Sequence, residues 1–137
     1  PPIHREAEHA FDASETSDVL FELDALIRRS ALHVNMPVEV RFVRGDRAWM
    51  SPASGRDTLQ LGVYHAQSAD LRPLFDGFDT IARRRRARPH WGKETALDHR
   101  DVVGAYPHAE RFLALRSELD PKGTMLNPYL ERMLGVG

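Results

Sequence analysis

The sequence predicts an α+β protein built on a ferredoxin-like antiparallel sheet, with helices on one face and further helices at the C-terminal end. Two observations support this fold class. Apolar residues follow strand and helix periods in the order β-α-β-β-α, the order of a ferredoxin-like unit that lacks only its closing strand. The chain has 137 residues, 42% of them hydrophobic, which suits a single core. We therefore expect residues 1–137 to form one domain.

The first two expected elements are a strand over residues 6–11 and a helix that begins in the hydroxyl-rich stretch 14–17. Ser and Thr are favoured helix caps. The helix has acidic residues early and arginines late, as its dipole prefers. Its apolar residues recur at helical spacing: Val19, Leu20, Leu23, Leu26 and Ile27. Asn35 and Pro37 are expected to end it.

Two strands and a second helix should follow. Residues 38–43 and 58–64 each alternate between apolar and polar side chains, which predicts an antiparallel hairpin with a long connection over 44–57. The next apolar residues have the spacing of an amphipathic helix: Leu71, Leu74, Phe75, Phe78 and Ile81. Pro89 should stop this helix, and the segment 88–93 is the candidate for the closing strand.

The C-terminal part is expected to be helical over residues 101–106 and 109–119. Residues 120–123 then form a turn, and a last helix starts with Asn127 as its cap and Pro128 at its first position.

Composition excludes several functions. There is no cysteine, so disulfides and thiolate chemistry are absent. His65, His99 and His108 lack the close spacing of metal ligands, so we expect no metal site. No apolar stretch is long enough to span a membrane, and we expect a soluble, cytoplasmic protein, with membrane association of a full-length protein left open.

Net charge gives no indication of a nucleic-acid partner. Lys and Arg number 19 against 20 acidic residues, for a formal charge of -1. The basic run 83–86 with Arg88 is not interleaved with aromatic residues, so we interpret it as a solvated helix end or a contact to a neighbouring domain and expect no nucleic acid to bind.

Two patterns carry candidate chemistry. Glu39 and Arg41 lie two apart on a strand and so share one face of the sheet. His90, Trp91 and Lys93 bring an imidazole, an indole and an ammonium group into four residues. A surface ion pair and a tryptophan packed on a turn are the structural alternatives, and the residues alone leave both open.

Five ordered motifs nonetheless resemble one family. They are PVEVRF (37–42), SP with GRD (51–52 and 55–57), RPHWGK (88–93), YP (106–107), and LDPKG with LNPYLE (119–123 and 126–131). Together they are similar to the aldonolactone oxidase family, which includes gulonolactone, arabinono-lactone and alditol oxidases in the vanillyl-alcohol oxidase superfamily. The resemblance covers residues 6–134.

The resemblance implies a flavoenzyme in which an N-terminal domain, missing from this chain, binds FAD while this chain forms the cap over the substrate. The absence of an initial Met also suggests a longer chain. In the family pattern Glu39, Arg41 and Lys93 are the catalytic candidates. His90 and Asn127 are the candidates for cofactor contact, although Asn127 is also explained as a helix cap.

The resemblance also implies a substrate. Alditol oxidases look to have a histidine where this sequence has Gly62, so a sugar lactone is expected before an acyclic polyol. Hydride would pass from a CH–OH group to flavin N5, and the isolated cap should be inactive. The alternatives are an alditol oxidase cap or a non-catalytic ferredoxin-like interaction module. The electron acceptor stays open.

Overall fold

A four-stranded antiparallel sheet forms the centre of the protein. The computed structural model describes residues 3–29, 34, 36–66 and 72–136. The strands are β1 (His4–Asp12), β2 (Glu39–Val43), β3 (Thr58–Ala66) and β4 (Arg88–Pro89), in the spatial order β2-β3-β1-β4. All three pairings are antiparallel. With one helix after β1 and one after β3, this is the ferredoxin-like topology, and the predicted α+β class is confirmed.

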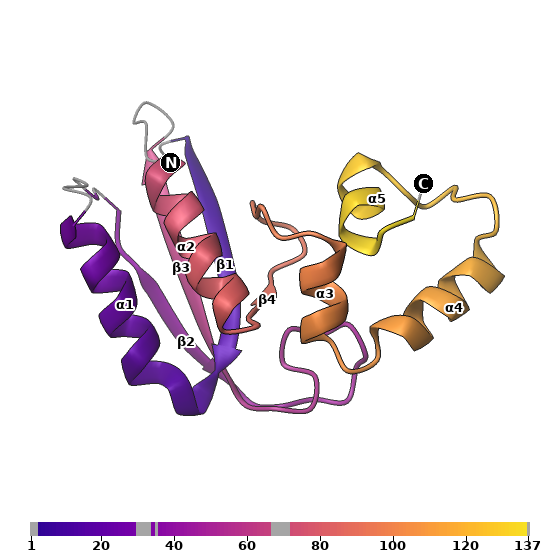
Figure 1. Cartoon of the computed structure of the whole chain (residues 1–137), viewed down its shortest axis with the longest axis horizontal. Coiled ribbons are helices and arrows are strands. Elements are labelled where there is room, and N and C mark those ends of the chain that lie inside the picture. Colours follow the sequence, from indigo (N-terminus) through magenta and orange to yellow (C-terminus); the bar gives the residue numbers. More distant parts are fainter. Residues whose placement is uncertain (1–2, 30–33, 35, 67–71, 137) are drawn as a thin grey trace.

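The helices α1 (Thr16–Arg29) and α2 (Arg72–Arg84) lie on the same face of the sheet (Figure 1). They cover the side chains of alternate strand residues because successive side chains of a strand point to opposite faces. The fully buried members of this core include Phe11, Leu59, Leu61, Leu74 and Phe78. The opposite face of the sheet, which carries Glu6 and Glu8, is not covered by these two helices.

Several element ends differ from the sequence prediction. Asp12, not a hydroxyl of residues 14–17, caps the 3-10 turn Ala13–Glu15 that precedes α1. Asn35 and Leu71, which were assigned to the end of the first helix and the start of the second, lie outside the described residues. On β2, Val40 and Phe42 are exposed, so the strand is less buried on its apolar side than the alternation predicted.

The closing strand is shorter than the predicted segment 88–93. Only Arg88–Pro89 pair with β1, and the chain then leaves the sheet in a turn. It returns twice to the same strand edge, where the amide of His90 donates to the carbonyl of Glu8 (3.0 Å) and that of Glu94 to Glu6 (2.9 Å). Residues 91–93 therefore bulge out between two fixed points.

Three helices follow: α3 (His99–Ala105), α4 (Ala109–Leu119) and α5 (Pro128–Leu134). Val102, Tyr106, Ala109 and Met133 make a second, smaller core between them. The predicted cap of the last helix is confirmed, since Asn127 Oδ1 accepts the Leu130 amide at 2.9 Å. Among the described residues no helix combines the length and apolar character needed to cross a bilayer.

Candidate functional site

The open face of the sheet brings together polar residues from β1, β2 and β3. The register places Glu8 of β1 opposite Gly62 of β3, and Gly62 opposite Glu39 of β2. Glu6 lies two residues from Glu8 and faces Tyr64. Paired residues of antiparallel strands share a face, so all these positions project away from α1 and α2.

Glu8 lies at the centre of this group and was not singled out from the sequence. Its side chain is only 2% exposed. Its carboxylate accepts from Arg41 Nη2 at 2.7 and 2.8 Å and from Lys93 Nζ at 2.9 Å. A buried carboxylate needs such charged donors, because burial of an unpaired charge is costly. Glu8 therefore fixes two of the three predicted catalytic residues.

Lys93 reaches the cluster from the turn after β4. Its Nζ also pairs with Glu6 Oε2 at 2.7 Å and lies over the ring of Tyr64, and the side chain is 17% exposed. Burial alone would lower the pKa of Lys93, but the hydrogen bonds with Glu6 and Glu8 outweigh it and raise the pKa. Lys93 is thus a permanent cation near neutral pH.

Glu39 and Arg41 form the more exposed side of the cluster. The Tyr64 hydroxyl donates to Glu39, whose other oxygen lies 3.4 Å from Arg41 Nε. Arg41 is 46% exposed and Glu39 40% exposed, so both retain surface for a ligand. Burial and the contact with Glu39 raise the pKa of the Tyr64 hydroxyl, which therefore stays protonated near neutral pH.

Gly62 lies between Glu8 and Glu39 and allows the side chain of Tyr64 to lie over it. A Cβ at this position would lie 3.3 Å from the ring and the hydroxyl of Tyr64 and 3.5 Å from Glu39 Cβ. A larger side chain would have to displace Tyr64. The glycine therefore determines the shape of the cluster's centre.

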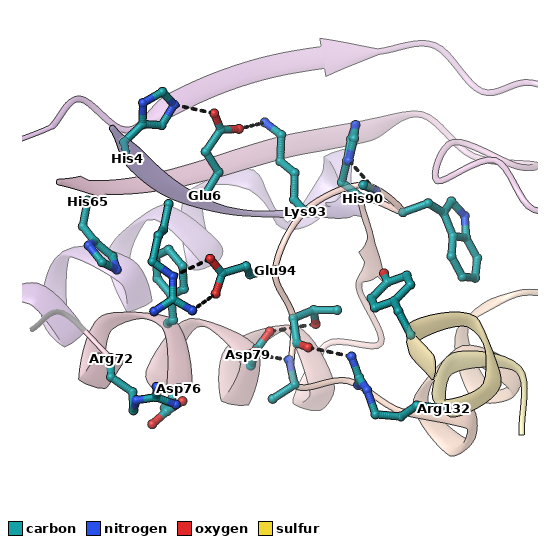
Figure 2. A pocket seen from close by; sticks show the side chains of 17 residues that line it. His4, Glu6, His65, Arg72, Asp76, Asp79, His90, Lys93, Glu94 and Arg132 are labelled. Carbon is teal, nitrogen blue, oxygen red and sulfur yellow. Dashed lines mark hydrogen bonds and ion pairs between the residues drawn. The ribbon is translucent and has the colours of Figure 1, made fainter. Parts of the chain in front are cut away.

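A cavity of about 810 Å³ adjoins the cluster (Figure 2). Glu6 and Lys93 line both, and His90 lies on the wall with its Nδ1 accepting the Gly92 amide at 3.1 Å. Asn127 does not line this cavity, and its Oδ1 is engaged in the cap of α5. Of the two residues predicted to contact a cofactor, only His90 thus lies beside Lys93.

A buried carboxylate behind the sheet holds the Lys93 turn in place. Asp79 of α2 accepts from Thr95 Oγ1 at 3.0 Å and from the Ala96 amide at 2.7 Å, just after the turn. It also pairs with His9 Nε2 at 2.8 Å. Burial would raise the pKa of Asp79, but its contacts, first of all that with His9, outweigh burial and lower it.

The assembled cluster offers both donors and acceptors to a ligand. Three of its members, Glu6, Glu8 and Tyr64, were missed in the sequence, where β1 appeared only as a weak strand. The available signal was the alternation of Glu6 and Glu8 with Ala7 and His9, the same pattern that singled out Glu39. In the described part of the chain, no three histidine or acidic side chains gather closely enough to hold a metal ion.

Comparison with known proteins gives consistent matches over nearly the whole chain. The D-arabinono-1,4-lactone oxidase family matches residues 4–133. An L-gulono-1,4-lactone dehydrogenase of Mycobacterium tuberculosis is 35% identical over 130 residues, covering 95% of this chain and 30% of that protein. L-gulonolactone oxidase of Bos taurus is 36% identical (90% of this chain, 29% of that protein). An alditol oxidase of a Streptomyces species is 32% identical (92% and 29%).

Proposed function

Because the chain belongs to the D-arabinono-1,4-lactone oxidase family, we propose that it supplies the substrate-binding and catalytic face of an FAD-dependent oxidoreductase acting on a CH–OH group of a sugar-1,4-lactone. The convergence of Glu39, Arg41 and Lys93 around the buried Glu8 is the observation that carries this proposal. The chain spans about 30% of the length of the relatives it matches. The proposal therefore includes an N-terminal FAD-binding domain in the same protein.

The charge state of each residue suggests its role. Oxidation of a CH–OH group requires the hydroxyl proton to leave as the carbonyl forms. Lys93 has a raised pKa and keeps its three protons, of which Glu6 and Glu8 accept two, so the third can donate to a substrate oxygen. Tyr64 also keeps its proton, which it donates to Glu39. Arg41 is half exposed and adds a fixed positive charge that stabilises developing negative charge on oxygen.

A carboxylate is then the remaining group for accepting the proton. Glu8 is buried and already accepts from two cations, which leaves it no surface for a ligand. Glu39 is 40% exposed and stands at the ligand-facing side of the cluster. We assign the base to Glu39 and the orientation of Arg41 and Lys93 to Glu8.

The residues around the cluster fit a flavin placed over the open face. FAD, when bound, supplies the acceptor for the hydride that leaves the substrate carbon. His90 is exposed on the cavity wall, and no described residue bonds its Nε2, so this nitrogen is available to a cofactor. Asn127 lies outside the lining of this cavity, and among the described residues only its Oδ1 is engaged, in the cap of α5, so Nδ2 is the atom left for the predicted cofactor contact.

We place a sugar lactone before an alditol because Gly62 stands where alditol oxidases are expected to carry a histidine. The ring and the hydroxyl of Tyr64 occupy the space that a side chain at this position would need, since a Cβ there would lie 3.3 Å from both. A histidine would therefore have to displace Tyr64. An alditol stays the second candidate substrate.

The test is turnover by the full-length protein loaded with FAD. L-gulono-1,4-lactone, D-arabinono-1,4-lactone and xylitol are offered to the wild type and to Glu39→Gln, Arg41→Ala and Lys93→Ala. Arg28→Ala is the matched control, since Arg28 lies on α1 and, among the described residues, pairs only with the exposed Asp24. We expect lactone turnover that falls at least a hundredfold in the three variants and is unchanged in the control, with flavin content constant.

Other outcomes would contradict parts of the proposal. Full turnover in all three variants would leave the family assignment intact and refute the site. A full-length protein that binds no flavin would instead support a non-catalytic interaction module. The chain by itself is expected to show no turnover, because the cluster then lacks its hydride acceptor.

A further inference from the structure

A second cavity lies away from the cluster and is rich in arginine. It has a volume of about 850 Å³ and shares no lining residue with the first cavity. Four arginines line it: Arg56, Arg85, Arg86 and Arg88. Three of them, Arg85, Arg86 and Arg88, belong to the basic stretch that we interpreted from the sequence as a solvated helix end or a contact to a neighbouring domain. The proposed oxidation uses none of the four.

Some N–H groups of these arginines have no acceptor among the described residues. Arg56 Nε and Arg85 Nε are both buried and bond to no described group. Arg88 is 3% exposed and donates through Nε and Nη1 to the carbonyls of Ala105, Pro52 and Ser54, but no described group accepts from its Nη2. Buried unsatisfied N–H groups are rare in native proteins and call for an acceptor.

Three of the four guanidinium groups also lack a carboxylate partner. Within 4.0 Å, no described acidic side chain pairs with Arg56, Arg86 or Arg88, which contact backbone carbonyls instead. Burial and the neighbouring charge of Arg56 lower the pKa of Arg88, against smaller opposing effects of acidic groups farther away. The cavity is therefore a site of concentrated positive charge.

A helix begins at the same cavity. Ala109 and Glu110, the first two residues of α4, are part of its lining, and His108 at the cap position makes no side-chain cap hydrogen bond. The first amides of this 11-residue helix add to the positive potential. The start of this helix and the four arginines thus line the same cavity.

Three carboxylates line the cavity against four arginines, so an excess of one positive charge remains. Glu15 pairs with Arg85, while Asp12 accepts from Ser14 and keeps its negative charge. Glu110 makes no ion pair with a described residue. Removing the charge of Glu110 should therefore strengthen the binding of an anion.

We propose that this cavity binds a phosphate group carried by a small molecule. A phosphate offers more acceptor oxygens than a carboxylate, which matches a lining that holds four guanidinium groups. The cavity is much larger than an inorganic phosphate ion, which leaves room for the organic part of a phosphate monoester. The site is independent of lactone oxidation and of its proposed residues.

The test is calorimetric titration with inorganic phosphate, at constant ionic strength, of the full-length protein that contains this chain. Arg56→Gln removes one guanidinium group of the lining. The contacts of its Nη2 to backbone carbonyls are long, 3.3 and 3.5 Å, so the fold should tolerate the change. Glu110→Gln removes the opposing charge. Arg28→Gln removes a positive charge elsewhere on the surface and is the control.

We expect saturable binding of one phosphate, weakened at least tenfold by Arg56→Gln, tightened severalfold by Glu110→Gln and unchanged by Arg28→Gln. An equal loss in the Arg28 control would show nonspecific ion binding and overturn the proposal. The absence of binding to the full-length protein would also overturn the proposal. This includes the case in which the 137-residue chain alone binds phosphate, because an acidic segment of the protein itself would then fill the cavity.

Discussion

Replacement of Glu8 by Gln should destabilise the protein through the two cations that the carboxylate holds. The change keeps the shape of the side chain and removes its charge. Removing one partner of a buried ion pair costs about 3–5 kcal/mol. Arg41 is 46% exposed and Lys93 keeps its contact with Glu6, so water and Glu6 recover part of this cost. We expect a loss of about 2 kcal/mol in the free energy of unfolding.

Urea denaturation of the chain at pH 7 measures this loss. Glu118→Gln, on the exposed side of α4, is the control for loss of one negative charge. A double variant, Glu8→Gln with Lys93→Met, tests the mechanism, because removal of the cation should lessen the effect of losing the anion. A loss below about 0.5 kcal/mol for Glu8→Gln, the range of ordinary surface substitutions, would refute the reasoning. Strict additivity in the double variant would refute it as well.

Three further predictions concern the surroundings of the cluster. Asp79→Asn should lower the free energy of unfolding, measured by urea denaturation, by about 2 kcal/mol, and Thr95→Val by about 1 kcal/mol. The carboxylate loses charge-assisted hydrogen bonds, while the threonine loses one hydrogen bond from a neutral donor. Equal losses would contradict this order. The hydrogen bond from Lys93 lowers the pKa of Glu6 below its ordinary 4.5. The contribution of Glu6 to the free energy of unfolding is therefore present above pH 4.5 and is lost as the pH falls through the lowered pKa. Glu6→Gln should reduce this loss of stability in acid, and an unchanged loss would refute the assignment. Asn127→Ala should cost about 1 kcal/mol and Asn127→Ser should restore most of it; a loss of flavin from full-length Asn127→Ser would reveal a cofactor contact instead.

The sheet could be predicted from the sequence because its strands and helices differ in apolar period. The alternation in residues 38–43 and 58–64 predicted a hairpin, and β2 and β3 pair accordingly. The closing strand was predicted too long because local sequence does not show that residues 91–93, which contain a glycine, leave the sheet edge. Their return to β1 depends on bonds to Glu6 and Glu8, 80 or more residues away.

Only part of the candidate site could be predicted from the sequence, for a related reason. Glu39 and Arg41 stand out because charged residues alternate with apolar ones on an evident strand. Glu8 does not, because acidic residues are seldom buried and nothing local shows that two cations will cover it. Its role follows from the register with Gly62 and from the turn that carries Lys93, both of which are long-range features.

The cluster on the sheet and the arginine-rich cavity differ in net charge, and this difference indicates what each can bind. In the cluster, three carboxylates, those of Glu6, Glu8 and Glu39, pair with two cations, Arg41 and Lys93, so one negative charge is in excess. Such a site does not attract an anion, but it offers donors and acceptors side by side, which suits an uncharged polyhydroxylated ring. In the second cavity, Arg56, Arg86 and Arg88 face only carbonyl oxygens among the described residues. Carbonyls orient guanidinium groups without cancelling their charge, so this cavity selects an anion that the first site would reject.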